Sequence, residues 1–179
     1  MRRTLALTLA VFCVGIALAK GPGVEPPSEG KAVVYFMRPT KIGMARPFHF
    51  FDGDKYINRM KGKNYFRYET EPGEHHFWAA AENRSHIKAD LEAGRVYALL
   101  ARVQFGIGSA RVYLEPISPD SEMWARCLKL VNRKAPSQPD PAYIEKWLAK
   151  KPDYTRIELE KWTKAGEPGT ILGPEDFIE

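Results

Sequence analysis

The chain has 179 residues, of which 44% are hydrophobic and 27% charged, and a formal net charge of +5 at pH 7. This length suits one domain with a core of its own. A charge of this size is ordinary for a soluble domain and does not indicate a partner made of nucleic acid. With only two cysteines, Cys13 and Cys127, the composition also excludes a framework of several disulfides.

The first nineteen residues have the pattern of a secretory signal peptide. The basic pair Arg2-Arg3 precedes an uncharged apolar stretch at 5–18, and small residues stand where signal peptidase needs them. The stretch is too short for a membrane span, which takes about 20 apolar residues. We therefore predict cleavage between Ala19 and Lys20 and a mature protein that is periplasmic or secreted, with no transmembrane segment. An uncleaved anchor is the alternative.

Cleavage at this position changes the chemistry of the mature chain. It removes two arginines and no acidic residue, so the formal charge falls by two, to +3. Cys127 becomes the sole cysteine, which excludes an intramolecular disulfide. Residues 20–30 contain three prolines and three glycines, and this composition predicts a flexible linker.

Residues 31–118 contain a series of short strand patterns that end in turn residues. The Asp52-Gly53-Asp54 sequence is a strong hairpin signal, because glycine tolerates the positive φ of a tight turn. Pro72-Gly73 fits a type II turn, which would pair the strand at 65–70 with the strand at 75–82. Strands are expected at 32–38, 46–51, 55–60, 65–70, 75–82, 86–91, 96–103 and 110–117.

The residue pattern within these segments predicts which strands are buried. Between residues 86 and 91, polar and apolar side chains alternate, as in a sheet with one face in water. The run at 96–103 is apolar on both faces, which indicates a central strand. We therefore expect a mainly β domain over 31–118, an antiparallel β-sandwich of seven or eight strands or a small barrel.

The periodicity changes from that of a strand to that of a helix after Ser118. The sequence from Ser118 to Ser121 offers a capped helix start. Apolar residues at helical spacing follow as far as Val131, and further helices are expected at 141–150 and 153–164, before an irregular end. Three of the four tryptophans lie here, so residues 119–179 should form a helical C-terminal extension packed on the sheet. A groove for an acyl chain between helix and sheet is the alternative.

Part of the strand-rich region resembles a known bacterial family. The segments KAVVYFMRP, FHFFDGDKYINRMKGKNYFRYETEPGEHHFWA and IKADLEAGRVYALLARV are similar to the domain of unknown function 2846 and to PEGA-type surface β-modules. The resemblance covers residues 31–115 approximately and implies a small secreted or lipid-anchored β-sandwich of the cell envelope, with no assigned activity and no functional residues to transfer. The chain departs from the family in lacking a lipobox and in its long helical C-terminus.

The four histidines, His49, His75, His76 and His86, all fall in predicted strands. The register set by the predicted turns places no two of them opposite each other, and adjacent residues of a strand point to opposite faces. No metal-binding spacing of histidine and cysteine occurs. We therefore expect structural histidines, no metal ion and no other cofactor.

Nothing in the sequence specifies a reaction, and we predict no catalytic residue. Cys127 lies on the apolar face of its expected helix, where a thiol is buried and unreactive. Nucleophile, phosphate-loop and dinucleotide motifs do not occur in the sequence. A hydrolase or thiol enzyme that uses Cys127 or a histidine is therefore only the third alternative.

Basic and aromatic residues interleave between residues 55 and 68. Aromatic side chains stack on sugars or on partner side chains, and basic ones suit anionic polymers such as lipopolysaccharide or teichoic acid. For most of this segment we favour the structural interpretation, cross-strand aromatic packing beside a solvated basic edge that discourages aggregation. The candidate interaction surface consists of Lys55, Tyr56, Arg59, Tyr65 and Arg67.

These patterns together predict a non-enzymatic interaction module of the bacterial envelope. Its partner would be an envelope protein or an anionic envelope polymer that meets an open sheet edge or the 55–68 segment. The alternative is a periplasmic protein that binds a glycan or a lipid in a groove covered by the helices.

Overall fold

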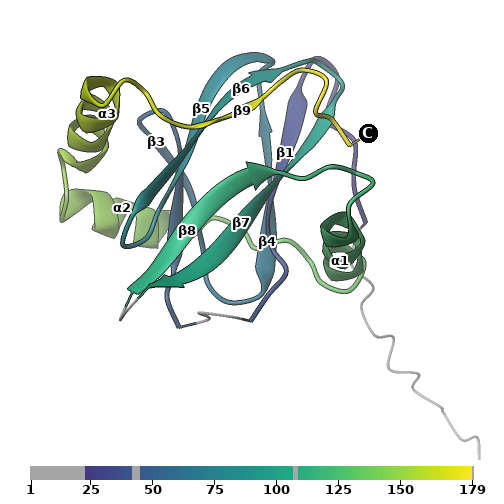
Figure 1. Ribbon diagram of the computed structural model, residues 1–179, viewed down its shortest axis with the longest axis horizontal. Helices are drawn as coiled ribbons and strands as arrows, with labels where there is room; N and C mark the ends of the chain where they lie inside the picture. Colours follow the sequence, from purple (N-terminus) through teal and green to yellow (C-terminus); the bar gives the residue numbers. More distant parts are fainter. Residues whose placement is uncertain (1–22, 42–44, 107–108, 179) are drawn as a thin grey trace, which may run out of the picture.

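The structure is a computed structural model that describes residues 23–41, 45–106 and 109–178 (Figure 1). The predicted signal peptide and its cleavage site between Ala19 and Lys20 lie outside these residues. The described residues form nine strands and three α-helices. The strands are β1 (Ala32–Arg38), β2 (Phe48–Asp52), β3 (Lys55–Met60), β4 (Asn64–Thr70), β5 (Gly73–Ala80), β6 (Arg84–Leu91), β7 (Val96–Gly106), β8 (Ser109–Pro116) and β9 (Thr170–Leu172).

The strands form two sheets that share one apolar core. Sheet A has the order β4-β1-β7-β8, and sheet B has the order β3-β2-β5-β6-β9. Phe36 and Leu99 of sheet A meet Phe50 and Phe77 of sheet B in this core. The expectation of a mainly β, sandwich-like fold is therefore confirmed.

Two details of the predicted architecture were wrong. The sheets are mixed, because β1 runs parallel to β7 and β6 runs parallel to β9. Residues 31–118 form eight strands, within the predicted range, but a ninth strand, β9, forms in the C-terminal extension, where an irregular end was expected. Both differences come from pairings between segments far apart in the sequence, which local periodicity does not encode.

The turn at Pro72-Gly73 does not join two neighbouring strands, as the sequence predicted. β4 pairs with β1, with Tyr68 opposite Val34, whereas β5 pairs with β2 and β6. Each of these strands buries one face in the shared core, so the turn carries the chain from sheet A to sheet B. The positive φ of Gly73, +107°, permits this turn.

Other local predictions are confirmed. In β6, Ile87, Ala89 and Leu91 are buried while Lys88 and Asp90 are exposed, as the alternation indicated. β7 lies between β1 and β8, as its two apolar faces predicted. The Gly53 turn joins β2 to β3 in an antiparallel hairpin.

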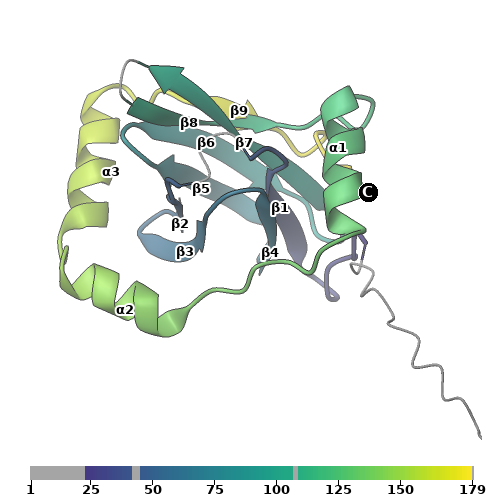
Figure 2. The ribbon, with the colours of Figure 1, turned by 90° about the horizontal axis from the view of Figure 1, so that it is seen from below.

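Three helices cover the outer faces of the two sheets, α1 (Glu122–Val131), α2 (Pro141–Ala149) and α3 (Tyr154–Lys164). α1 packs on sheet A, and α2 and α3 lie on the opposite side of the molecule against sheet B (Figure 2). The Ser121 hydroxyl accepts a hydrogen bond from Trp124 N at 3.1 Å, which caps α1 as predicted. In the described residues, the helices are too short or too polar to span a membrane.

The end of the chain, predicted to be irregular, is tied to both sheets. β9 adds to the edge of β6, with Ile171 opposite Lys88. Beyond it, Ile178 N donates to Val96 O in sheet A at 2.7 Å. A Cβ at Gly169 would lie 2.8 Å from the backbone oxygen of His86, so the missing side chain allows β9 to begin close beside β6.

Candidate functional site

The two tyrosines of the predicted interaction surface are buried by the chain itself. Tyr56 faces out from sheet B, but α2 covers it, and its ring centroid lies 5.2 Å from that of Trp147. Tyr65 faces out from sheet A beneath α1, and its hydroxyl donates to the backbone oxygen of Lys134 at 2.7 Å. The side chains of Tyr56 and Tyr65 therefore lie on opposite sides of the molecule.

The basic residues Lys55 and Arg59 of that surface also contact the chain's own aromatic residues. Lys55 Nζ donates to the hydroxyl of Tyr68 at 3.3 Å. The guanidinium of Arg59 lies 3.7 Å from the ring centroid of Tyr143 in α2, a cation–π contact. These contacts connect the hairpin β2–β3 to β4 and to α2.

Arg67, the last residue of the set, binds the segment that precedes β1. Its guanidinium donates to the backbone oxygen of Pro26 at 2.9 Å and to Glu69 at 2.6 Å. Glu25 N donates to the hydroxyl of Tyr35 at 2.9 Å, so residues 23–30 of the predicted linker run along sheet A. The five predicted residues do not form one exposed surface, because Tyr56 and Tyr65 are buried on different faces.

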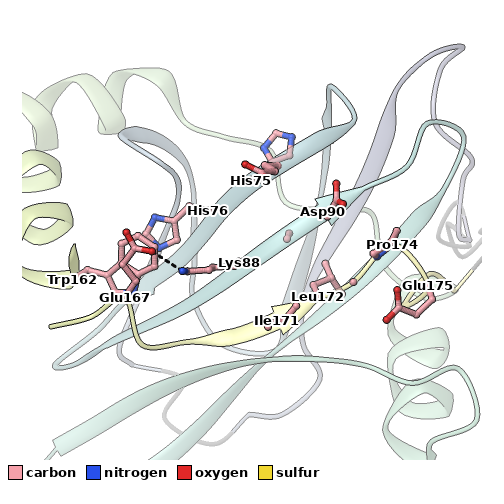
Figure 3. Close-up of a pocket in the computed structure, with 13 residues that line it drawn as sticks. His75, His76, Lys88, Asp90, Trp162, Glu167, Ile171, Leu172, Pro174 and Glu175 are labelled. Carbon is pink, nitrogen blue, oxygen red and sulfur yellow. Dashed lines mark hydrogen bonds and ion pairs between the residues drawn. The ribbon is translucent and has the colours of Figure 1, made fainter. Parts of the chain in front are cut away.

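A groove of about 760 Å³ opens on the outer face of sheet B, beside the C-terminal end of α3 (Figure 3). Strands β5, β6 and β9 form its floor, and the chain on both sides of β9 forms its rim. We call it the acidic groove. The residues that line it are Glu74, His75, His76, Lys88, Ala89, Asp90, Trp162, Glu167, Ile171, Leu172, Gly173, Pro174 and Glu175.

A tryptophan forms one end of the acidic groove. The indole of Trp162 stacks on the imidazole of His76 with 3.7 Å between ring centroids, and its N–H donates to Pro168 O at 2.8 Å. Lys88 Nζ lies 5.4 Å from the indole centroid and 2.6 Å from a carboxylate oxygen of Glu167 (Figure 3). Trp162 is thus held in one orientation by its neighbours.

Carboxylates dominate the charge of the acidic groove. Its lining includes the carboxylates of Glu74, Asp90, Glu167 and Glu175 and one amine, that of Lys88, which pairs with Glu167. Even when His75, which also lines the groove, is protonated, four carboxylates against two cations leave a net negative charge on a chain that is positive overall. Beside them the side chain of Ile171 is 71% exposed, which adds an apolar contact surface.

Two histidines meet at the tryptophan end. His76 Nε2 and His86 Nδ1 lie 3.0 Å apart. As predicted, no two histidines lie directly opposite each other, but His86 lies opposite Trp78 and is therefore diagonal to His76 on the same face. Burial lowers the pKa of both imidazoles to about 4, so both are neutral at pH 7 and one donates to the other.

The other two histidines have separate partners. His75 directs Nδ1 at Asp52 Oδ2 and Nε2 at Glu71 O, both at 2.9 Å. Two acceptors favour the doubly protonated ring, and the hydrogen bond to Asp52 raises the pKa of His75. His49 Nδ1 lies 2.6 Å from the hydroxyl of Tyr56. Among the described residues, no three side chains of histidine, cysteine or acid are grouped as a metal site would need.

Cys127 lies on the side of α1 that packs on sheet A and is fully buried. Burial raises the pKa of its thiol to about 12, so the thiol is protonated at neutral pH. This environment matches the sequence-based interpretation of Cys127 as a buried thiol.

The chain matches no protein-family model and no curated protein. The resemblance to the domain of unknown function 2846 therefore stays a prediction. The fold and its surface define a mainly β protein of two mixed sheets that carries an acidic, tryptophan-walled groove on one face.

Proposed function

We propose that this protein is an exported, non-enzymatic interaction module of the bacterial envelope whose acidic groove holds a basic segment of a partner protein. The observation that supports this proposal is the acidic groove itself, in which four carboxylates surround an exposed isoleucine and a fixed tryptophan. Such a surface complements a chain segment with lysine or arginine next to apolar side chains.

The charge of the groove favours a protein over the anionic polymers considered from the sequence. Phosphate or carboxylate groups of a polymer would be repelled by Glu74, Asp90 and Glu175. A cationic side chain would instead gain charge-assisted hydrogen bonds to these carboxylates, and a cation–π contact with Trp162 lies within reach. The proposed partner is therefore an envelope protein.

The dimensions of the groove also suit a peptide segment. Its volume of about 760 Å³ lies in the range of ligand clefts and can hold a few side chains. The interface between sheet B and the helices α2 and α3 is filled by aromatic residues such as Phe51, Trp78 and Trp147. The acidic groove, beside the C-terminal end of α3, has room for a peptide segment.

The decisive experiment places a photoreactive residue at Ile171 and, as a matched control, at Ile157, which is 40% exposed on α3. Cells are irradiated, and adducts of each variant are identified by mass spectrometry. We expect one dominant protein adduct from position 171 and none from position 157. Similar adduct patterns from both positions, or adducts with anionic polymer alone, would contradict the proposal.

Charge reversal tests the electrostatic part of the proposal. Asp90→Lys in the groove should reduce the adduct from position 171 by about tenfold, since it reverses one of the recognising charges. Asp120→Lys, an exposed residue just before α1, is the control and should leave the adduct unchanged. Cell fractionation with mass spectrometry of the N-terminus tests export, for which a chain beginning at Lys20 outside the cytoplasm is expected.

A further inference from the structure

A second pocket lies at the opposite end of β5 from the acidic groove. It has a volume of about 240 Å³ and is bounded by β2, by the start of β6 and by the connection between α2 and α3. We call it the basic pocket. Its lining includes Arg46, His49, Arg84, Trp147, Lys151 and Tyr154.

The charge of this pocket is opposite to that of the groove. Three cationic side chains line it, against the one carboxylate of Glu82. Arg46 pairs with Glu82 at 3.5 Å, and Arg84 pairs with Glu158 at 2.9 Å. Lys151 differs from both arginines, since among the described residues it forms no ion pair.

Aromatic rings hold the amine of Lys151 at the pocket. Its Nζ lies 4.9 Å from the ring centroid of Trp147 and 5.1 Å from that of Tyr154. These cation–π contacts keep the charge in place without neutralising it. Lys151 is exposed, so an anion can reach its amine from the solvent.

His49 supplies a second donor from the sheet. Burial, together with the charges of Lys151, Arg59 and Arg84, lowers the pKa of His49 to about 4, so its ring is neutral at pH 7. Burial raises the pKa of the Tyr56 hydroxyl, which keeps its proton and can donate it to His49 Nδ1. The ring proton then lies on Nε2, which has no hydrogen-bond partner among the described residues.

We propose that the basic pocket binds a small oxyanion, a phosphate or carboxylate group, with Lys151 Nζ and His49 Nε2–H as its donors. The pocket is smaller than the usual range for drug-sized ligands, which suits a compact anion. Among the described residues, Lys151 Nζ has no acidic partner and His49 Nε2–H has no acceptor. An oxyanion would accept hydrogen bonds from both groups. This site is separate from the acidic groove and does not depend on the proposed function.

The test is a calorimetric titration of the purified protein with inorganic phosphate at constant ionic strength, which keeps non-specific screening constant. We expect saturable binding that Lys151→Gln weakens by about tenfold or more. Lys150→Gln, at the exposed neighbouring residue outside the pocket lining, is the matched control and should bind phosphate like the unaltered protein. Thermal melting of both variants verifies that each is folded.

Two results would overturn the proposal. One is the absence of saturable binding at phosphate concentrations up to about 10 mM, a weak limit for a specific site. The other is equal loss of binding in both lysine variants, which would indicate a diffuse surface effect. Flotation with phosphatidylglycerol vesicles then separates the sources of the anion. Co-flotation that requires Lys151 assigns a lipid headgroup, and binding of free phosphate alone assigns a soluble anion.

Discussion

The side-chain amide of Asn83 pairs with the backbone of Val112 as a neighbouring strand would. Asn83 Nδ2 donates to Val112 O, and Asn83 Oδ1 accepts from Val112 N, both at 2.8 Å. Asn83 lies between β5 and β6 of sheet B, whereas Val112 lies in β8 at the edge of sheet A. One sheet therefore satisfies backbone groups at the edge of the other and protects that edge from further pairing.

Replacing Asn83 with alanine should lower the free energy of unfolding by about 2 kcal/mol or more, since it leaves two backbone groups of Val112 without partners. Urea denaturation measures the change. Asn132→Ala, at an exposed position after α1, is the control and should change stability by less than about 0.5 kcal/mol. Equal stability of the two variants would show that water replaces the amide without cost.

The adjacent residues Ile171 and Leu172 test whether β9 belongs to sheet B. Leu172 is fully buried in the shared core, and Ile171 is 71% exposed. Leu172→Ala should destabilise the protein by about 2–4 kcal/mol because it leaves a cavity. Ile171→Ala should cost less than about 0.5 kcal/mol. Chemical denaturation of both variants checks this, and similar small effects would mean that β9 is detached in solution.

Three partly buried histidines should make the free energy of unfolding decrease in acid. His49, His76 and His86 have pKa values lowered from 6.5 to about 4 by burial. Between these two values each histidine binds a proton in the unfolded chain but not in the folded one, so stability is lost as the pH falls through this window. Because all three are partly buried, the free energy of unfolding should decrease by at least about 1 kcal/mol from pH 7 to pH 5.

His75 acts in the opposite direction and provides an internal control for this pH dependence. Its pKa is raised by Asp52, so its stabilisation is complete at low pH and is lost as the pH rises through the folded-state value. The variant His76→Gln should therefore show a shallower loss of stability on acidification, and His75→Gln a steeper one. Urea denaturation at both pH values measures this, and parallel pH profiles for the two variants would refute the assignment.

Cys127 should resist alkylation in the folded protein. Its thiol is fully buried and its pKa is about 12, so little thiolate exists and reagent has no access. In a chain that begins at Lys20, iodoacetamide should label Cys127 at least about 100-fold more slowly in buffer than in urea. The rate is followed by mass spectrometry. Rapid labelling of the native protein would contradict this prediction and would favour a thiol enzyme that uses Cys127.

The covering of Tyr56 by α2 illustrates what could not be read from the sequence. The interleaved basic and aromatic residues at 55–68 offered a candidate surface, but the favoured interpretation, aromatic packing, describes Tyr56. The residue that covers it, Trp147, lies 91 positions further along the chain. The acidic groove is built in the same way, because Asp90 of β6 meets Glu167 and Glu175 only through the pairing of β9.

The sequence by itself determined the features that depend on neighbouring residues. The alternation at 86–91 identified the outward Lys88 and Asp90, and Ser121 marked the start of α1, because side-chain periodicity and helix capping act within a few residues. The tertiary structure alone decided which sheet each strand joins, where β9 pairs and which surface stays open. These choices follow from burying apolar faces in a common core, and that free energy is shared among segments far apart in the chain.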